Sequence, residues 1–252
     1  MIMTLHNNLR GGYQYLQGID PYSSGVVSAD GFEIIQTTLV KPLPWQLGIM
    51  RTRRYLELLG RDHFALCGIQ LRCPQPHSMA GFIDFNRDYR QLLESWQMME
   101  GNDNPVARTN VSPVIDPPGE TMLYGFSYTV PTTIAGKTFV VAGGGELVGA
   151  LDETRIVRVG ETSQESLTEK ARCVTGLMRD RLLGLKVAES QLSQIDVYTA
   201  HPLQSLLEQI IISDISAAAH LGVHWFYSRP PVVNIEFEMD MRGVRQELVV
   251  AL

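Results

Sequence analysis

The chain lacks a long apolar run and an excess of positive charge. No stretch approaches the ~20 consecutive apolar residues that a bilayer-spanning helix needs, and residues 1–10 lack the apolar segment of a secretion signal. The 21 Lys and Arg are outnumbered by 27 Asp and Glu, which gives a net charge of −6. Nucleic-acid-binding proteins need a basic face to neutralise phosphates. We therefore expect a soluble cytoplasmic protein that binds neither nucleic acid nor membrane.

Cysteine is scarce, and metal ligands are poorly placed. Cys67, Cys73 and Cys173 form an odd set without metal-type spacing, which suits a reducing compartment. His220 and His224 are four residues apart, but Gly222 lies between them, where a helix should end. We expect neither a disulfide framework nor a metal site.

Two common catalytic motifs are also absent. Ser23 and Ser24 do not lie in a Gly-x-Ser-x-Gly elbow, so a serine-hydrolase triad has no support. The glycines at 143–145 lack the Gly-x-Gly-x-x-Gly spacing of a dinucleotide site. The sequence thus gives no sign of an organic cofactor.

What is present is ample material for a folded core. Hydrophobic residues make up 44% of the 252 residues and charged residues 19%, and this length fits one large domain or two domains of about 125 residues each. Apolar spacing in the first half predicts a strand pair within 26–40, a helix over 45–59, a strand over 63–72 and a helix over 79–99. Two strands near 109–115 and 121–130 complete it.

The second half repeats this order. We predict strands at 137–142 and 155–159, helices at 162–183 and 202–221, and further strands at 191–199, 232–239 and 246–250. In each half an arginine, Arg108 or Arg229, follows the second helix, and the two are 121 residues apart. An internal repeat of this kind determines the whole fold. We therefore predict an α/β (α+β) protein with two tandem domains of β-β-α-β-α-β-β order, 1–130 and 131–252.

Several short motifs occur in this order. The first half has Pro21-Tyr22-Ser23, FNRDY at 85–89 and PVARTNV at 105–111; the second half has Gly143-Gly144, LGL at 183–185 and IDVY at 195–198. Together they resemble the Rid (YjgF/YER057c/UK114) superfamily, and the chain looks like a tandem two-domain member. The match covers nearly the whole chain.

The resemblance implies a fold and an activity. Each domain would be a mixed sheet on two helices, three sheets would close into a barrel, and active sites would lie in clefts between domains. An arginine would bind the substrate carboxylate, and a glutamate on the last strand would orient the hydrolytic water. Substrates would be 2-imino or 2-enamino acids, hydrolysed to 2-oxo acids and ammonia without metal or organic cofactor. A homo-oligomer, most simply a trimer of chains, is expected.

The resemblance also points to candidate site residues. The candidate catalytic residues are Arg229 and Glu247 in the second half and Arg108 and Glu120 in the first; the candidate substrate-binding residues are Tyr22, Asn86, Gly143, Gly144 and Trp225. A guanidinium can donate two parallel hydrogen bonds to a carboxylate, and a glycine turn lets backbone N–H groups approach a substrate. A carboxylate can hold a water and move its proton.

Each half holds only part of the expected set. The second half lacks the helix asparagine, and the last strand of the first half contains no glutamate inside, so the location of the working site stays open. Arg229 could also close a strand edge in an ion pair, Glu247 could be an exposed carboxylate, and Trp225 could be a core residue rather than a stacking surface.

Three functions remain open at this point. One is a deaminase of a 2-aminomuconate-type ring-cleavage product in aromatic catabolism. Another is a non-catalytic ligand-binding or regulatory protein, and the third is a chorismatase-like lyase or hydrolase. Fold alone cannot separate them.

Overall fold

The computed structural model, which describes residues 4–19 and 21–252, contains two mixed β-sheets. The seven-stranded sheet has the order β1 (Leu5–Asn8), β2 (Tyr13–Leu16), β3 (Gly25–Ser28), β8 (Phe139–Gly145), β12 (Glu238–Gly243), β9 (Gln194–Tyr198) and β10 (His224–Phe226). The six-stranded sheet has the order β11 (Ser228–Arg229), β6 (Ala107–Pro113), β5 (Leu66–Arg72), β7 (Met122–Pro131), β4 (Phe32–Pro44) and β13 (Glu247–Val250).

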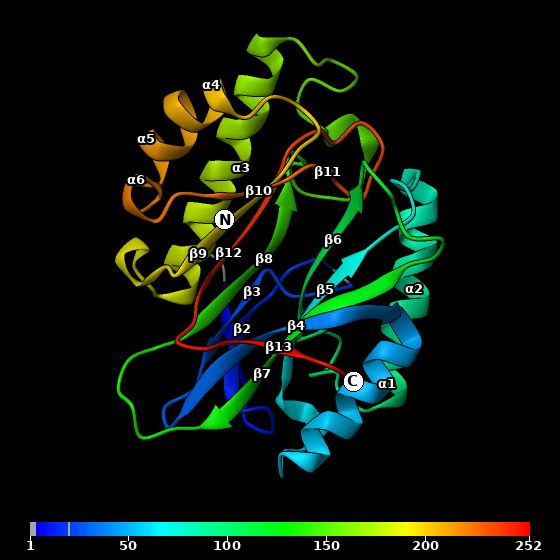
Figure 1. Ribbon diagram of the computed structural model, residues 1–252, viewed down its shortest axis with the longest axis vertical. Coiled ribbons are helices and arrows are strands. Elements are labelled where there is room, and N and C mark those ends of the chain that lie inside the picture. The colour runs from blue at the N-terminus through cyan, green and yellow to red at the C-terminus, as the bar shows by residue number, and fades with distance from the viewer. Residues whose placement is uncertain (1–3, 20) are drawn as a thin grey trace.

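Helices cover the outer face of each sheet (Figure 1). The seven-stranded sheet carries α3 (Gln164–Leu185) and the short helices α4 (Gln204–Leu206), α5 (Ile212–Asp214) and α6 (Ala218–Leu221). The six-stranded sheet carries α1 (Trp45–Leu58) and α2 (Met79–Ser95). A smaller apolar cluster with residues from both sheets lies between them, so the two sheets pack against each other.

Alternation along β12 places a polar row between the sheets. Successive strand residues point to opposite faces. Met239 and Met241 pack in the core beneath α3. Glu238, Asp240 and Arg242 are also buried, and Asp240 and Arg242 line a small gap together with residues of the six-stranded sheet. This row is the polar centre of the molecule.

The three long helices form where the sequence predicts them, although α2 ends at Ser95 and not at residue 99. Serine caps begin α2 and α3, whereas α1 begins after Pro44 without a side-chain cap. The Ser78 hydroxyl accepts a hydrogen bond from Gly81 N at 3.1 Å, and the Ser163 hydroxyl accepts one from Ser166 N at 3.2 Å. Serine is a favoured N-cap because its oxygen satisfies an otherwise free backbone donor. The third helix runs slightly beyond Gly184 and ends at Lys186, which takes the left-handed conformation.

Three predicted elements are wrong, and the first is the strand expected over 232–239, since β12 begins only at Glu238 and runs to Gly243. The strand expected over 155–159 is absent; a 3₁₀ turn (Glu153–Arg155) forms instead, because the Asp152 carboxylate caps Thr154 N at 2.9 Å. The helix expected over 202–221 is broken into α4, a π-helical turn (Leu207–Ile211), α5 and α6. Extended backbone at Ile215, whose side chain is buried in the core, separates α5 from α6.

Strands are exchanged between the two sheets. The segment 26–40 forms two strands joined by a turn in which Phe32 N donates to Ala29 O, but they do not pair with each other as predicted: β3 pairs with β8 and β4 pairs with β7. Near the C-terminus β13 returns to pair in parallel with β4, and β11 pairs with β6. This arrangement depends on strand pairings between residues far apart in the sequence, so it becomes visible only in the structure.

Four strands in each sheet share one topology. In the six-stranded sheet the order is β4-β7-β5-β6, and in the seven-stranded sheet it is β8-β12-β9-β10. In both, the first two pairings are antiparallel and the third, β5 with β6 or β9 with β10, is parallel. By this correspondence β10 is the counterpart of β6.

Candidate active site

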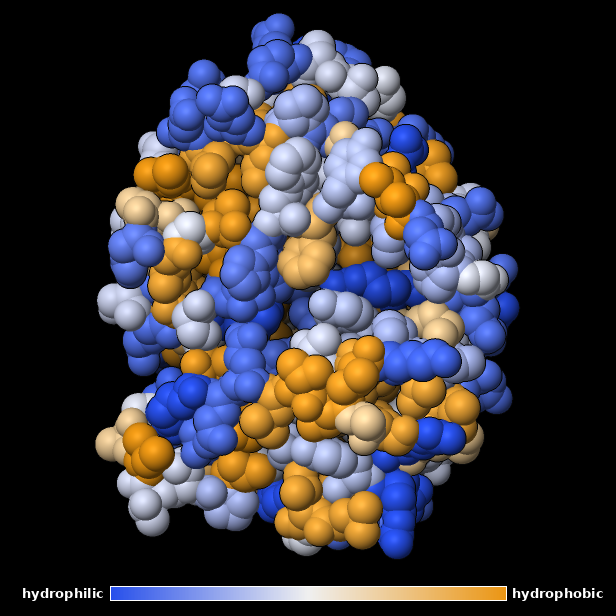
Figure 2. Space-filling model, viewed as in Figure 1, coloured by the Kyte–Doolittle hydropathy of each residue, from blue (hydrophilic) through white to orange (hydrophobic). Residues whose placement is uncertain are grey.

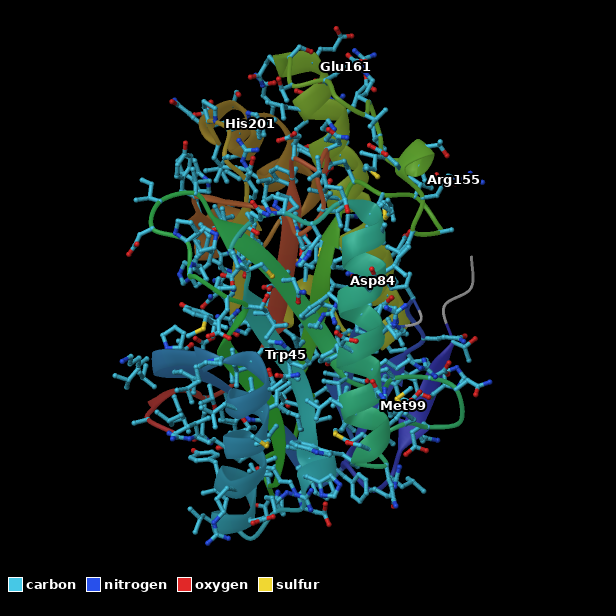
Figure 3. The ribbon with its side chains drawn as sticks, turned by 90° about the vertical axis from the view of Figure 1, so that its right-hand side faces the viewer. Trp45, Asp84, Met99, Arg155, Glu161 and His201 are labelled. Atoms are coloured by element: carbon cyan, nitrogen blue, oxygen red, sulfur yellow. The ribbon has the colours of Figure 1, made fainter. Side chains whose placement is uncertain are left out.

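A cavity of about 930 Å³ lies where the two halves of the chain meet. Its wall comes from the segment before β3, the start of α2, the glycines of β8, the loop at 147–151, the end of α3 and the segment before β12. His77 N donates to Pro231 O at 2.8 Å and Val233 N donates to His77 O at 2.9 Å, which ties the halves together beside it. In Figure 3, the labels of Asp84 on α2 and of Arg155, just beyond the 147–151 loop, mark two of the segments near the cavity.

Glu238 is a buried carboxyl group in the cavity wall. Glu238 is 4% exposed, and its side chain forms no hydrogen bond or ion pair with any of the described residues. Burial raises its pKa well above the ordinary value, and nearby Asp240 adds to the rise, whereas Arg181 and Arg108 oppose it. A carboxyl group with a raised pKa holds its proton more tightly than an exposed one and can exchange it with a bound molecule.

The glycines of β8 make room for this group. A side chain at Gly143 would collide with Glu238 Oε1 and come within 3.1 Å of Thr109 Cα. One at Gly144 would come within 2.7 Å of Leu177 and 2.9 Å of Arg181 Nη1. The two glycines therefore let β8 pass closely between β6 and α3.

Arg108 is a buried cation without an anionic partner. Only 2% of the residue is exposed, and its guanidinium lies 4.6 Å from the ring centre of Tyr22 and 4.4 Å from that of Tyr89. Nη2 donates to Asn86 Oδ1, but Nη1 has no partner among the described residues. A buried charged donor left unpaired is costly, so this group is suited to binding a small anion.

Backbone contacts hold Tyr22 beside Arg108. Asn104 Nδ2 donates to Pro21 O at 2.7 Å, and Ser23 N donates to Val106 O at 3.1 Å. The segment that carries Tyr22 is thereby fixed next to the start of β6.

Arg181, on α3, is the second buried guanidinium. The residue is 8% exposed, and its Nη1 donates to Ala142 O at 2.7 Å and to Gly143 O at 3.2 Å. Nε has no partner in the described part of the chain. Unlike Arg108, Arg181 lies directly in the cavity wall.

The structure brings five of the predicted residues together. Tyr22, Gly143 and Gly144 line the cavity, and Arg108 and Asn86 lie directly behind Tyr22.

Two of the predicted catalytic residues lie elsewhere. Arg229 is exposed on β11, which pairs antiparallel with β6; the counterpart of β6 is β10, which contains no arginine. Glu247 begins β13, where its carboxylate is 44% exposed and pairs with Arg242 Nε at 2.8 Å. The expected equivalence of Arg108 and Arg229 is therefore not found, because the chain leaves its own sheet after β10.

Glu120 and Trp225 also lie outside the cavity wall. Glu120 is exposed in the loop before β7. Trp225 is 47% exposed, and its Nε1 donates to Thr199 O at 3.0 Å.

Sequence reasoning missed Glu238 and Arg181, although each left a signal. The segment IEFEMDM at 235–241 alternates apolar and acidic residues, as a strand with one polar face does. Arg181 follows Val174 by seven residues and Met178 by three, so it lies on the apolar face of its helix. A charged residue in such a position is a candidate functional group.

The remaining candidate features concern metals and membranes. Within residues 4–19 and 21–252, no three His, Cys, Asp or Glu side chains are grouped as ligands for a metal ion. A reaction without metal or organic cofactor stays a prediction. In the same part of the chain, no helix has the length and apolarity required to span a bilayer.

Two comparisons with known proteins point to one family, and a third shows a shared fold. The family model described as 2-aminomuconate deaminase CnbZ matches residues 5–248. A 2-amino-5-chloromuconate deaminase from Comamonas testosteroni is 39% identical over 245 residues, which cover 95% of this chain and 96% of that one. A crystal structure of chorismatase shares the fold, with a TM-score of 0.50 and 11% identity over 94% of this chain and 78% of the other. The chain belongs to the 2-aminomuconate deaminase family.

Proposed function

We propose that this protein is a hydrolytic deaminase that converts a 2-enamino or 2-imino acid of the 2-aminomuconate type into a 2-oxo acid and ammonia. The observation that carries the proposal is the unpaired, buried Glu238 carboxyl group in a cavity that adjoins Arg108, whose Nη1 has no partner among the described residues. The names of the family and of its Comamonas relative supply the substrate class.

Arg108 would bind the carboxylate next to the amino-bearing carbon. Its free Nη1 offers a charge-assisted hydrogen bond in a site from which water is largely excluded. Asn86 holds the other arm of the guanidinium and the aromatic rings pack on its faces. The substrate would thus be oriented by a preorganised group, at little entropic cost during the reaction.

Glu238 would supply the proton that starts the reaction. In its neutral form it donates a proton to the nucleophilic carbon of the enamine, and the nitrogen lone pair forms the C=N bond of an iminium ion. Burial raises the pKa of Glu238 and so favours the protonated form that this step needs. The product of this step is an electrophilic carbon beside the newly formed carboxylate base.

The Glu238 carboxylate would then accept a proton from water as the water oxygen bonds to the iminium carbon. The same proton passes to the nitrogen of the resulting carbinolamine. The C–N bond breaks as the hydroxyl proton leaves through Glu238 and the C=O bond forms. One water is consumed, one ammonia is released, and Glu238 regains its proton.

The two halves of the chain would be diverged copies of one Rid-type domain, divided near residue 131. Their shared strand topology supports this, as does the chorismatase likeness at the level of the fold. Since β10 has no arginine where β6 has Arg108, each chain would contain one site of this kind, built from both halves. We place the protein in the cytoplasm, as a catabolic enzyme for products of aromatic-ring cleavage.

An ammonia-release assay on 2-aminomuconate tests the proposal. Arg108→Ala should lower kcat/KM by roughly 30- to 4,000-fold, mostly through KM, because it leaves a substrate carboxylate unpaired in a dry site. The matched control is Arg229→Ala, which removes an exposed arginine and should leave turnover within about twofold of the parent. A prior treatment with chelator should have no effect if no metal takes part.

Two results would decide against the deaminase. Tight binding of the substrate without ammonia release would support the non-catalytic ligand-binding protein. Turnover of chorismate in place of 2-aminomuconate would support the chorismatase-like enzyme.

A further inference from the structure

The proposed deamination leaves one cation of the cavity without a role. Among the described residues that line the cavity, Arg181 is the single basic side chain. Arg108, which would bind the carboxylate beside the reacting carbon, belongs to β6 and the α2 side of the cavity, whereas Arg181 comes from α3. The cavity therefore adjoins two guanidinium groups that come from different halves of the chain.

The contacts of Arg181 fix its guanidinium in place and leave one of its nitrogens free to bind a ligand. Its Nη1 is fixed by two carbonyls of β8, Ala142 O and Gly143 O, while Nε has no partner. No Asp or Glu of the described chain forms an ion pair with it. A buried guanidinium without a carboxylate is costly unless an anion completes it.

Both guanidinium groups affect the pKa of the same two side chains, Glu238 and Tyr22. Arg181 and Arg108 each lower the pKa of Glu238 and of Tyr22, against the effect of burial. The Glu238 carboxyl group therefore lies within electrostatic reach of both cations. A substrate carbon placed beside Glu238 would have one cation for each of two carboxylates.

We propose that Arg181 binds the distal carboxylate of a dicarboxylic substrate and so makes the enzyme selective for dicarboxylates over monocarboxylates. This inference rests on the proposed deaminase function. A conjugated chain holds its two end carboxylates apart, so one guanidinium cannot pair with both. With Arg108 on the proximal carboxylate, Arg181 is the cation of the cavity wall that remains for the other.

The test compares two substrates on the same variants. One is 2-aminomuconate, with two carboxylates, and the other is a 2-imino acid with a single carboxylate, generated in the assay by an amino-acid oxidase. Arg181→Met should lower kcat/KM for the dicarboxylate by about 30-fold or more, mainly through KM. For the monocarboxylate it should change kcat/KM by less than about threefold, so the ratio between substrates falls.

The ratio also separates recognition from other roles. Loss of Arg181 removes a charge that lowers the pKa of Glu238, but this affects both substrates alike and cancels in the ratio. Arg179→Met is the matched control, because Arg179 is an exposed neighbour on the same helix. Arg181→Lys, which keeps the charge, should retain more of the selectivity than Arg181→Met and serves if the methionine variant does not fold.

A second readout does not depend on turnover. Binding of muconate, which has both carboxylates and no amino group, is measured by titration calorimetry. Arg181→Met should weaken it at least tenfold. An equal loss of activity on both substrates, or unchanged muconate affinity, would overturn the role of Arg181. If the parent protein binds muconate in an Arg181-dependent way yet deaminates neither substrate, the proposed function fails and the dicarboxylate site stands.

Discussion

The ammonium of Lys170 and the carboxylate of Glu146 form an ion pair in which both side chains are completely excluded from solvent, with Nζ and Oε1 3.0 Å apart. The same carboxylate accepts hydrogen bonds from Glu236 N at 2.6 Å and Phe237 N at 3.0 Å. Glu146 thereby links α3 to the backbone directly before Glu238.

Removal of one partner of this ion pair should be strongly destabilising. Lys170→Met leaves Glu146 buried without its cation, and we expect a loss of about 3–5 kcal/mol in the free energy of unfolding. The double variant Lys170→Met with Glu146→Gln should recover part of this loss, because the uncompensated charge is gone. Chemical denaturation of the three proteins measures both values. If Lys170→Met were as stable as the parent protein, the ion pair would contribute little to the stability of the fold.

Glu238 should destabilise the fold at neutral pH. Its pKa is raised in the folded protein above the ordinary 4.5. Such a group stabilises the folded state fully below its unfolded pKa, and this contribution is lost as the pH rises through the folded pKa. Glu238→Gln should therefore raise the midpoint of thermal unfolding at pH 8 by a few degrees.

The pH dependence of that difference is the decisive measurement. The gain from Glu238→Gln should shrink toward zero near pH 4, where the parent carboxyl group is protonated in both states. The variant should also lose about 10²–10⁴-fold in kcat, because Gln cannot transfer a proton. Glu120→Gln, at an exposed position, is the control and should alter neither quantity. A constant stability difference from pH 4 to pH 8 would contradict the burial argument.

Gly143 should not tolerate a side chain. Gly143→Ala brings a methyl group against Glu238 Oε1 and the backbone of Thr109, so we expect a severe loss of activity and a loss of stability of roughly 1–3 kcal/mol. Gly176→Ala is the matched control: its position in α3 is open, and removal of a helical glycine should stabilise by about 0.5–1 kcal/mol. Circular dichroism melts and ammonia release on both variants test this contrast.

The protein should be a homo-oligomer, most simply a trimer, with one ligand site per chain. Light scattering gives the mass, and calorimetry with muconate gives the stoichiometry. Figure 2 shows apolar side chains gathered over β13, β4 and α1, where Val40 is 68% exposed, Met50 53% and Val249 72%. The outer edge of β13 is also unpaired within the described chain. We expect a second copy to cover this surface.

A charge at Val249 tests the same expectation. Val249→Lys should reduce the mass measured by light scattering while the protomer stays folded. A monomeric parent protein, or two muconate sites per chain, would contradict the prediction.

The first half of the site could be predicted from sequence because its signals are local. Tyr22, Asn86 and Arg108 stand in the short motifs that carry the resemblance to the Rid superfamily, and the structure brings these side chains together. The helix starts predicted at residues 79 and 162 lie within two residues of the observed starts of α2 and α3, where a local serine, Ser78 or Ser163, caps the helix.

The part of the site that comes from the second half of the chain could not be predicted, because it depends on strand pairings between residues far apart in the sequence. The sequence predicts 246–250 as the last strand of its own domain and Glu247 as the glutamate of that strand. In the structure that segment pairs with β4, more than 200 residues earlier, and Glu238 occupies the cavity instead. Arg229 was misplaced for the same reason, because β11 joins the sheet of the other half.

The exchange of strands has a consequence for the integrity of the chain. Residues 132–136 connect the halves and are mostly exposed, while β3 lies in a sheet with strands of the second half and β13 in a sheet with strands of the first. A protease that cut this connector would break the polypeptide but leave each fragment anchored inside the other's sheet. The nicked protein should migrate as one particle until denaturant is added. Neither fragment synthesised alone would have a complete sheet, so the two would have to be produced together to fold.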